Sequence, residues 1–296
     1  MELKRIPEDF VVREKSTAVV KGAGEYVYFL LRKRGYNTLD AVEAVANALH
    51  VPAGWIGFAG NKDKQAVTEQ VCSINNVSAE RLKEVLINDI EIIVLGRGEK
   101  PISLGDLDGN YFEITIRDAP APEKRARFVN YFGEQRFGEN NADVGKAIVK
   151  KDFKQAAYLL GFNPLNPVSE LVRLNKKLLG IYVNAFQSKI WNESVRKIIE
   201  LGISADDVPV VGFGTEFIIP EVEKVVSGIL AVEGVSLRDF IIKQIPELSA
   251  EGAVRKVYCE AQDLAVEKKD NDVLLKFFLP KGCYATVFVE QLFKAE

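Results

Sequence analysis

One aspartate lies between two lysines in the stretch GNKDKQAVTEQ, residues 60–70. Asp63 has Lys62 and Lys64 beside it, and the preceding Gly-Asn pair allows a sharp turn because both residues tolerate positive φ. A positive charge within about 4–6 Å lowers the pKa of a carboxyl group and keeps it ionised. An ionised carboxylate suits a nucleophile or a general base. The alternative is a solvated turn, and the local pattern taken alone favours that alternative.

A second candidate cluster is NYFGEQRFG, residues 130–138, which combines aromatic rings with an amide and a guanidinium group. A base that has been turned out of a nucleic-acid stack needs a stacking surface and hydrogen-bond partners for its edge. Asn130 and Phe132 could supply them. The alternative is the end of a helix with core aromatics, which we expect to hold for at least one of Tyr131, Phe132 and Phe137.

Three further residues are weaker candidates. Phe10 in PEDFVV and Tyr284 in LPKGCYATVF each stand beside turn residues, and each taken alone favours core or turn packing. Gln70 follows Asp63 on the next predicted strand, on the same side as Thr68. These two polar residues could orient a substrate or support the loop.

Composition excludes several classes of protein. The chain has 296 residues, of which 47% are hydrophobic, and this suffices for two domains with real cores. No apolar stretch approaches the roughly 18 residues of a membrane span, and the N-terminus lacks the pattern of a signal peptide. One histidine and three widely spaced cysteines argue against a metal site or a disulfide framework. Glycine patterns for nucleotide binding are incomplete. We therefore expect a soluble, cytoplasmic protein without metal, cofactor or membrane contact.

The net charge of −3 is unusual for a protein that binds nucleic acid, because phosphate contacts normally require a basic excess. Basic residues gather locally, in residues 30–38 and 123–138, whereas the stretch from about 200 to 272 is acidic. Local basic patches could bind RNA. Charge segregation between solvated faces is an equally good interpretation.

Hydrophobic periodicity predicts an α+β fold. We expect strands over residues 9–14, 25–33, 66–74, 90–96 and 109–118, and a helix over 37–50 with Thr38 as its N-cap. A helix is also expected to begin at Pro122 and to run to Gly138. Amphipathic helices over 145–161 and 183–202 follow, and residues 272–294 return to a strand and a final amphipathic element. The pattern fits an α+β domain interrupted by an insertion of roughly a hundred residues.

Taken in order, several blocks closely resemble the TruD family of tRNA pseudouridine synthases, of the archaeal type. They are PEDFVVRE, GEYVYFLLRKRGYNT, FAGNKDKQAVTEQ, LGDLDGNYFEITIR, NYFGEQRFG, NAFQSKIWN and FFLPKGCYATVF. The resemblance implies a pseudouridine synthase catalytic domain, a mixed and mainly antiparallel sheet with flanking helices, over residues 1–151 and 258–296. It implies an inserted α/β TRUD domain over residues 152–257.

The resemblance also implies an activity and roles for individual residues. The family isomerises uridine to pseudouridine, typically uridine 13 of tRNA, without metal or organic cofactor. Asp63 matches the family's nucleophile, and Phe10, Asn130 and Tyr284 match substrate-contacting positions. Phe132 and Gln70 are further candidates for substrate contact, Gln70 also as a support.

Lys62 is expected to support Asp63 by keeping it ionised. The expected partner is tRNA, and the expected state is a monomer or weak homodimer. An alternative function is RNA binding or RNA folding with dispensable catalysis. A small-molecule hydrolase is disfavoured, because no partner base or metal ligand accompanies Asp63.

Overall fold

The computed structural model describes residues 2–163, 165–174 and 176–294, which divide into two compact units. Unit 1 contains the chain up to Arg127 together with the chain from Glu260, and unit 2 contains Phe128–Cys259. The chain therefore leaves unit 1, completes unit 2 and returns. The predicted family domains, with boundaries at 151/152 and 257/258, stay a prediction.

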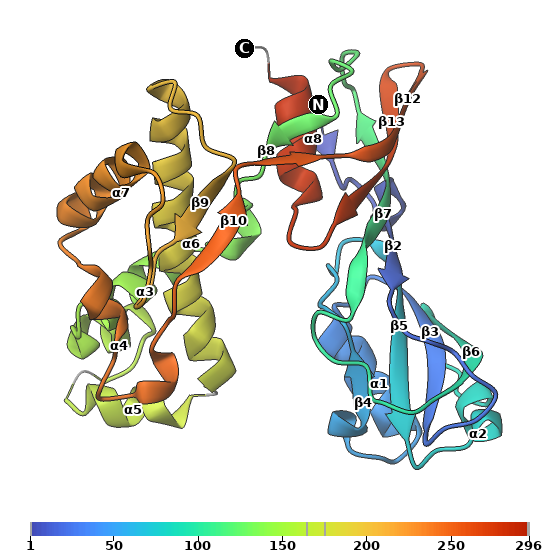
Figure 1. The fold of residues 1–296 in the computed structure, drawn as a ribbon. Helices are drawn as coiled ribbons and strands as arrows, with labels where there is room; N and C mark the ends of the chain where they lie inside the picture. Colours follow the sequence, from blue (N-terminus) through green and yellow to red (C-terminus); the bar gives the residue numbers. More distant parts are fainter. Residues whose placement is uncertain (1, 164, 175, 295–296) are drawn as a thin grey trace. The chain divides into compact units, whose positions relative to one another are not determined.

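Unit 1 is built on one sheet with strand order β12-β13-β7-β2-β5-β3-β6. Figure 1 shows these strands with the helices beside them. Among these neighbours only β2 and β5 run parallel, so the sheet is mixed and mainly antiparallel, as predicted. The elements of this unit are β1 (Glu2–Leu3), β2 (Phe10–Ser16), β3 (Tyr26–Arg34), α1 (Thr38–Ala48), β4 (Ile56–Phe58), β5 (Val67–Asn75), α2 (Ala79–Lys83), β6 (Ile90–Gly98), β7 (Leu107–Arg117), β12 (Gln262–Lys269), β13 (Asp272–Pro280) and α8 (Ala285–Phe293).

The inner face of this sheet is mainly apolar, because apolar side chains alternate along its strands. On β7 the predicted alternation is confirmed: Phe112, Ile114 and Ile116 are buried. Helix α1 packs on this face over β3 and β5, in a core that includes Val42 and Phe29. Helix α8 packs on the same face over β13. The two helices thus shield one side of the sheet from water.

The outer face carries what we call the charge ladder, a row of acidic and basic side chains in alternation across the strands. Glu69 on β5 lies 3.6 Å from Arg13 on β2 and 3.6 Å from Arg32 on β3. Arg32 in turn lies 3.6 Å from Glu91 on β6. The full row runs through Glu267, Lys276, Glu113, Arg13, Glu69, Arg32 and Glu91.

Carboxylates therefore accompany several arginines of the segments that looked basic in sequence. Besides the ladder, Arg34 forms a 2.5 Å ion pair with Glu8. The local basic excess of residues 30–38 does not produce an unopposed basic surface on this face.

Helix α1 begins one residue earlier than the sequence indicated. Asn37 is its N-cap and accepts a hydrogen bond from the backbone N–H of Asp40. The prediction of Thr38 as N-cap was wrong, because an asparagine in the preceding position caps at least as well. The hydroxyl of Thr38 is therefore available for other contacts, which are described below.

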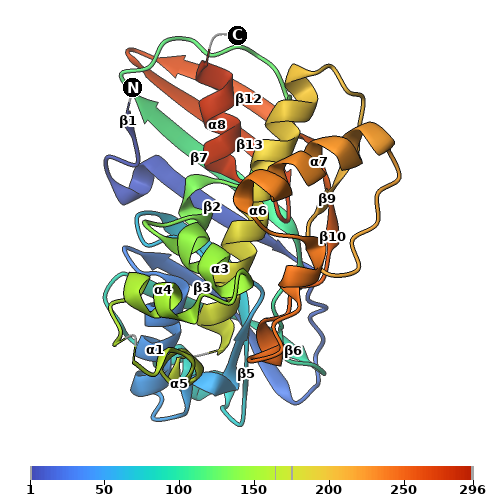
Figure 2. The ribbon, with the colours of Figure 1, turned by 90° about the vertical axis from the view of Figure 1, so that its left-hand side faces the viewer.

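Unit 2 is mainly helical around α6, against which α3 and α7 pack (Figure 2). Fully buried side chains recur along α6, among them Phe186, Ile190 and Trp191. Its elements are α3 (Asn141–Val149), α4 (Phe153–Leu159), α5 (Pro167–Arg173), α6 (Lys176–Glu200), β9 (Asp207–Val210), α7 (Pro220–Glu233) and β10 (Ala253–Lys256). Strands β8 (Arg127–Val129) and β11 (Tyr258–Glu260) lie where the chain passes between the units.

Three helix predictions differ from the structure. The helix expected over 183–202 forms as α6 but begins earlier, at Lys176, and ends at Glu200. The helix expected over 145–161 is broken into α3 and α4, because Lys151 adopts φ 61° and Asp152 caps the second helix. The helix expected from Pro122 to Gly138 does not form. That stretch contains β8 and a single 3-10 turn at Glu134–Arg136. Pro122 was interpreted as a helix start, but residues 121–126 form no regular secondary structure.

Candidate active site

Asp63 lies on the loop between β4 and β5. Hydrogen bonds to buried polar groups hold that loop in place. The backbone N–H of Lys62 donates to the hydroxyl of Thr38 at 2.8 Å. The Thr38 hydroxyl donates to Oε1 of Gln70 at 2.8 Å, and Nε2 of Gln70 donates to the carbonyl of Gly60 at 3.1 Å. Thr38 and Gln70 are 1% and 0% exposed. The start of α1 and strand β5 together fix the shape of the loop.

Gln70 consequently has a different position from the one expected of a substrate contact. Its side chain is buried, and both ends of its amide bind the loop scaffold. Thr68 on the same strand is buried as well. Of the two roles considered from sequence, the geometry supports the supporting role.

Lys62 is paired with a carboxylate other than the expected one. Its ammonium group lies 2.7 Å from Oε2 of Glu14, and the two side chains are 6% and 0% exposed. The other oxygen of Glu14 accepts the backbone N–H of Val71 at 3.3 Å. The expectation that Lys62 pairs with Asp63 is therefore wrong. Asp63 forms its ion pair with Lys4, and Lys62 ties the loop to β2.

Lys4 places a positive charge directly on Asp63. Its Nζ lies 2.6 Å from Oδ2 of the aspartate, and the two side chains are 17% and 25% exposed. The same Nζ lies 4.0 Å from the centroid of the Phe10 ring, a cation–π contact. An opposite charge at this distance favours the ionised form of a carboxylate. Phe10 and Asp63 are thus brought together around Lys4.

Phe10 is one end of a row of aromatic rings across the inner face. It is 3% exposed and meets Phe112 edge to face at 6.1 Å. Phe112 stacks on Phe277 at 5.3 Å, and Phe277 meets Phe288 of α8 at 4.8 Å. The Phe10 ring is therefore held in place by its aromatic neighbours and contacts Lys4, and little of its own surface is exposed.

A second lysine, Lys33, contacts the backbone of the loop that carries Asp63. Lys33 is 1% exposed, and its Nζ donates to the backbone carbonyl of Asp63 at 3.1 Å and to that of Tyr36. Burial lowers the pKa of the Lys33 ammonium to about 8, and the nearby Asp63 charge opposes this effect. Lys33 holds the backbone at Asp63, whereas Lys4 holds its side chain.

The sequence interpretation missed Lys4 and Lys33. A signal for Lys4 was present: Lys62 and Lys64 alternate with Asp63, so on an extended chain they point away from it. The partner cation therefore had to come from a distant segment. Nothing local distinguishes Lys33, because in sequence it is one cation in a basic run.

Asn130 and Phe132 belong to unit 2 and are held there by a residue that was also missed, Arg255. Asn130 is 6% exposed, and its Oδ1 accepts from Nη2 of Arg255 at 2.7 Å. The Arg255 guanidinium lies 4.1 Å from the centroid of the Phe132 ring. Phe132 also meets Trp191 edge to face at 5.5 Å. The expectation that some aromatics of this block pack into a core is met by Phe132, which lies against the core of unit 2.

Tyr284 is the N-cap residue of α8 in unit 1 and is partly buried. Its carbonyl accepts the backbone N–H of Phe288 at 3.1 Å. The position at the start of α8 fixes the backbone of Tyr284. Its role in substrate contact stays a prediction.

The described part of the chain contains neither a cluster of metal-ligating side chains nor a helix that could span a membrane. Residues 2–163, 165–174 and 176–294 contain no cluster of three or more His, Cys, Asp or Glu side chains that could hold a metal ion. No helix within these ranges is both long enough and apolar enough to cross a bilayer.

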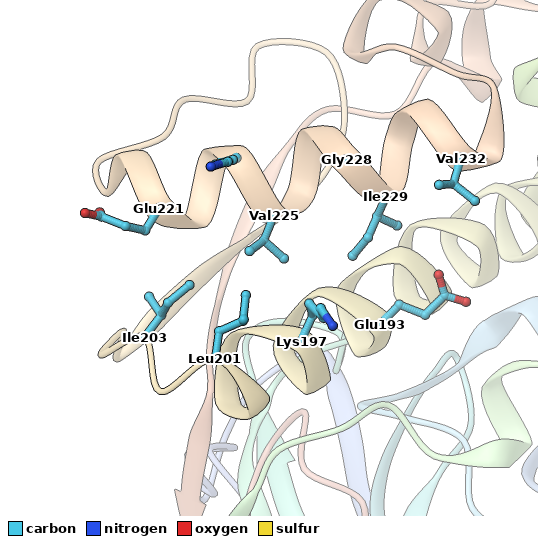
Figure 3. A pocket seen from close by; sticks show the side chains of 10 residues that line it. Glu193, Lys197, Leu201, Ile203, Glu221, Val225, Gly228, Ile229 and Val232 are labelled. Carbon is cyan, nitrogen blue, oxygen red and sulfur yellow. The ribbon is translucent and has the colours of Figure 1, made fainter.

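A pocket of about 610 Å³ lies between α6 and α7 in unit 2 (Figure 3). Apolar side chains such as Leu201, Val225 and Ile229 line it, with Glu193 and Lys197 among its charged groups. None of the candidate site residues lines this pocket. Since its lining offers no buried or activated polar group, we do not assign the chemistry to it.

Comparison with known proteins defines the class of this fold. A solved structure described as the "Putative tRNA pseudouridine synthase D (TruD)" from Methanosarcina mazei superposes with a TM-score of 0.75 at 26% identity. The superposition covers 100% of this chain and 94% of the other. The mixed sheet with its flanking helices is thus the fold of a pseudouridine synthase.

The family model for tRNA pseudouridine synthase D (TruD) matches residues 1–173 and 206–292. The chain belongs to the TruD family, whose members are isomerases that act on tRNA.

Two curated relatives illustrate the match. The tRNA pseudouridine synthase D of Aquifex aeolicus is 28% identical, with 99% of this chain and 98% of the relative covered. The "Probable tRNA pseudouridine synthase D" of Thermococcus sibiricus is 26% identical, with 99% and 94% covered. That second alignment extends over 400 residues, against the 296 of this chain. This chain is therefore a compact member of the family.

Proposed function

We propose that this protein converts a uridine of tRNA, uridine 13, to pseudouridine, with Asp63 as the nucleophile. One observation carries the proposal. Asp63 stands on a loop that buried hydrogen bonds hold in place, and its carboxylate is 2.6 Å from the Lys4 ammonium above the Phe10 ring. Family membership supports the class of reaction, and the names of the relatives support tRNA as the substrate.

The reaction rearranges bonds within one nucleoside. The bond between N1 of uracil and C1′ of ribose breaks, the detached uracil rotates, and a bond from C5 to C1′ forms. The Asp63 carboxylate begins the sequence by adding to the sugar at C1′ or to the base at C6. Loss of the proton from C5 and protonation of N1 complete the new nucleoside, and the carboxylate is released unchanged. Atoms and electrons balance without a further reactant.

The residues around Asp63 have separate roles in this proposal. Lys4 keeps the carboxylate charged and oriented toward the substrate. Lys33, Lys62 and Gln70 position the loop and do not touch the nucleotide. Phe10, Asn130, Phe132 and Tyr284 are assigned to the substrate from their match to the family motifs. A nucleotide must leave its stack to reach such a site, which aromatic and amide groups favour.

The proposal is tested with an unmodified tRNA transcript, purified protein and site-resolved mapping of pseudouridine. Wild type is expected to modify uridine 13, and a transcript with cytidine at that position should gain no pseudouridine. Asp63→Ala and Asp63→Asn should both fall below detection, because the nucleophile is absent. Full activity in Asp63→Ala would contradict the assigned mechanism. Modification at another uridine would contradict only the assigned position.

The alternative of RNA binding with dispensable catalysis is separated by a cellular assay. Under that alternative, wild type and Asp63→Asn would rescue a strain lacking the protein equally well. Our proposal expects rescue of the modification by wild type alone. The cytoplasmic location and the monomeric or weakly dimeric state stay predictions, which fractionation and light scattering would check.

A further inference from the structure

Arg255 fixes the orientation of the Asn130 amide. Its Nη2 donates to Oδ1 of Asn130 at 2.7 Å, and its Nε donates to the Asn130 backbone carbonyl at 3.0 Å. On the other side of the amide, Nδ2 donates to the carbonyl of Lys256 at 3.2 Å. A guanidinium group can only donate and a carbonyl oxygen can only accept, so these contacts permit one orientation. The flipped amide would face donor with donor and acceptor with acceptor.

Arg255 is itself held in place. Its guanidinium lies over the rings of Phe132, at 4.1 Å, and Trp191, at 5.3 Å from the centroids. Asn192 clamps the backbone of Phe132 from both sides, since it accepts the Phe132 N–H at 2.9 Å and donates to the Phe132 carbonyl at 2.9 Å. Trp191 and Asn192 close the NAFQSKIWN block on α6, a motif to which the proposed function gives no role.

One edge of the Asn130 amide is left over for a ligand. After the contacts with Arg255 and Lys256, one N–H of Nδ2 and one lone pair of Oδ1 have no hydrogen-bond partner in the described part of the chain. Asn130 is only 6% exposed, so the amide cannot turn freely in solvent to reverse the two. A planar ligand meets a donor and an acceptor in a fixed order.

Uracil and cytosine differ in the order of these groups. Uracil presents a carbonyl oxygen that accepts, beside an N3–H that donates. Cytosine presents an amino group that donates, beside an N3 that accepts. An asparagine free to flip would match either base, whereas one fixed orientation matches one base in a given pose.

We propose that Arg255 is a specificity-determining residue, which makes Asn130 read uracil and reject cytosine by fixing the orientation of its amide. The inference rests on the proposed function, in which the base of the target uridine reaches Asn130. Arg255 acts through Asn130 and is therefore a positioning residue. The stacking on Phe132 and Trp191 gives this role a planar guanidinium, which lysine cannot replace.

The test measures the ratio of dissociation constants for two tRNA transcripts that differ only at the mapped target, uridine or cytidine. All variants are made in an Asp63→Asn parent, so that binding is measured without turnover. The parent should favour uridine by about tenfold or more, as expected for a paired donor–acceptor contact. Arg255→Met should bring the ratio close to one. Arg255→Lys keeps the charge but loses the planar guanidinium with its several donors, and it should bring the ratio close to one as well.

A matched control removes one positive charge elsewhere in unit 2. Lys243 is exposed, and Lys243→Met should weaken both transcripts equally and leave the ratio unchanged. A merely structural role of Arg255 would likewise weaken both transcripts equally. Thermal unfolding verifies that each variant folds, and Arg255→Lys decides the matter if Arg255→Met does not fold.

An unchanged ratio in a folded Arg255→Lys variant would overturn the inference, as would a parent that binds both transcripts equally. Failure of the proposed function is a separate observation, because it shows as an absence of pseudouridine in transcripts treated with wild type.

Discussion

The lysine that pairs with Asp63 comes from the distant N-terminal segment, whereas Lys62, adjacent in sequence, pairs with a different carboxylate. Lys4 makes the ion pair, and Lys62 is buried against Glu14. Lys64 is exposed. Lys4, Lys62 and Lys64 thus differ in what they contact, and mutation can separate their contributions.

Lys4→Met should lower kcat for pseudouridine formation by about a hundredfold, because a preorganised charge at the nucleophile is lost. Lys64→Met removes an equal charge from the loop that carries Asp63 and should leave kcat within about twofold. Single-turnover rates on saturating tRNA measure both. Equal rates for the two variants would show that the Lys4–Asp63 pair has no part in the reaction.

Lys33 makes stability depend on pH in the alkaline range. Its pKa is lowered to about 8 by burial, below its value in the unfolded chain, so between these values the unfolded state binds more protons. Stability therefore rises with pH in this window, and the neutral amine still donates to both carbonyls. Relative to Lys33→Met, wild type should gain about 3 kcal/mol of unfolding free energy between pH 8 and 10.5.

Urea denaturation at pH 8 and pH 10.5 measures this difference, with Lys64→Met as a control that should show none. A difference between wild type and Lys33→Met that stays constant over this range would mean that Lys33 keeps its ordinary pKa in the folded protein.

Helix α1 and strand β5 together support the loop that carries Asp63, and one hydroxyl joins them. The Thr38 hydroxyl bonds both Gln70 and the backbone of Lys62. Thr38→Val preserves shape but leaves a buried amide oxygen and a buried N–H without partners. We expect a loss of about 3 kcal/mol of unfolding free energy and a fall in kcat.

Thr38→Ser keeps the hydroxyl and serves as the matched variant for this pair of elements. Its unfolding free energy should stay within about 1 kcal/mol of wild type, with kcat restored. If valine and serine behaved alike in chemical denaturation and in single-turnover kinetics, the hydroxyl bridge would be irrelevant to the loop.

The elements that the sequence predicted well are those with strong periodicity. Strand β7 alternates cleanly, and α6 repeats apolar residues with helical spacing, so both follow from local pattern. The stretch from Pro122 to Gly138 was wrong because its helix signals are outweighed by tertiary contacts. The backbone N–H and carbonyl of Phe132, in the middle of this stretch, both hydrogen-bond to the side chain of Asn192, sixty positions away in the chain.

The candidate site was predictable only in part, for a similar reason. Asp63 and Asn130 were found from their motif blocks, but their partners come from remote segments. Lys4 and Arg255 have no local pattern that marks them. Side-chain pairing across long sequence separations is set by the fold, and composition or spacing does not encode it.

At the scale of the whole molecule, unit 1 is closed at the point where unit 2 is inserted. The N–H of Ala261 donates to the carbonyl of Ala126 at 2.9 Å, so the two ends of the interruption lie side by side. The segment before the interruption is also tied to α8, since the Glu123 N–H donates to the carbonyl of Leu292 at 3.2 Å. The fold of unit 1 thus meets the geometric requirement for a shortened connection.

Replacing Phe128–Cys259 by a short glycine-rich turn should give a folded, catalytically inactive protein. Shortening such a loop lowers the entropic cost of closure. Circular dichroism and urea denaturation should show a sheet-rich protein with one cooperative transition. Non-cooperative unfolding or persistent aggregation would show that unit 1 depends on unit 2 for its stability.

The charge ladder on the outer face of the sheet affects non-specific binding of RNA to that face. Lysine and arginine strengthen binding to a polyanion when phosphates replace mobile ions and release them. Along the ladder the counterions of Arg13 and Arg32 are fixed carboxylates of the protein itself, which cannot be released. A phosphate that approaches this face gains no ion-release entropy and meets the repulsion of Glu69 and Glu91. The outer face therefore contributes little non-specific affinity, and unproductive encounters with RNA there are short-lived.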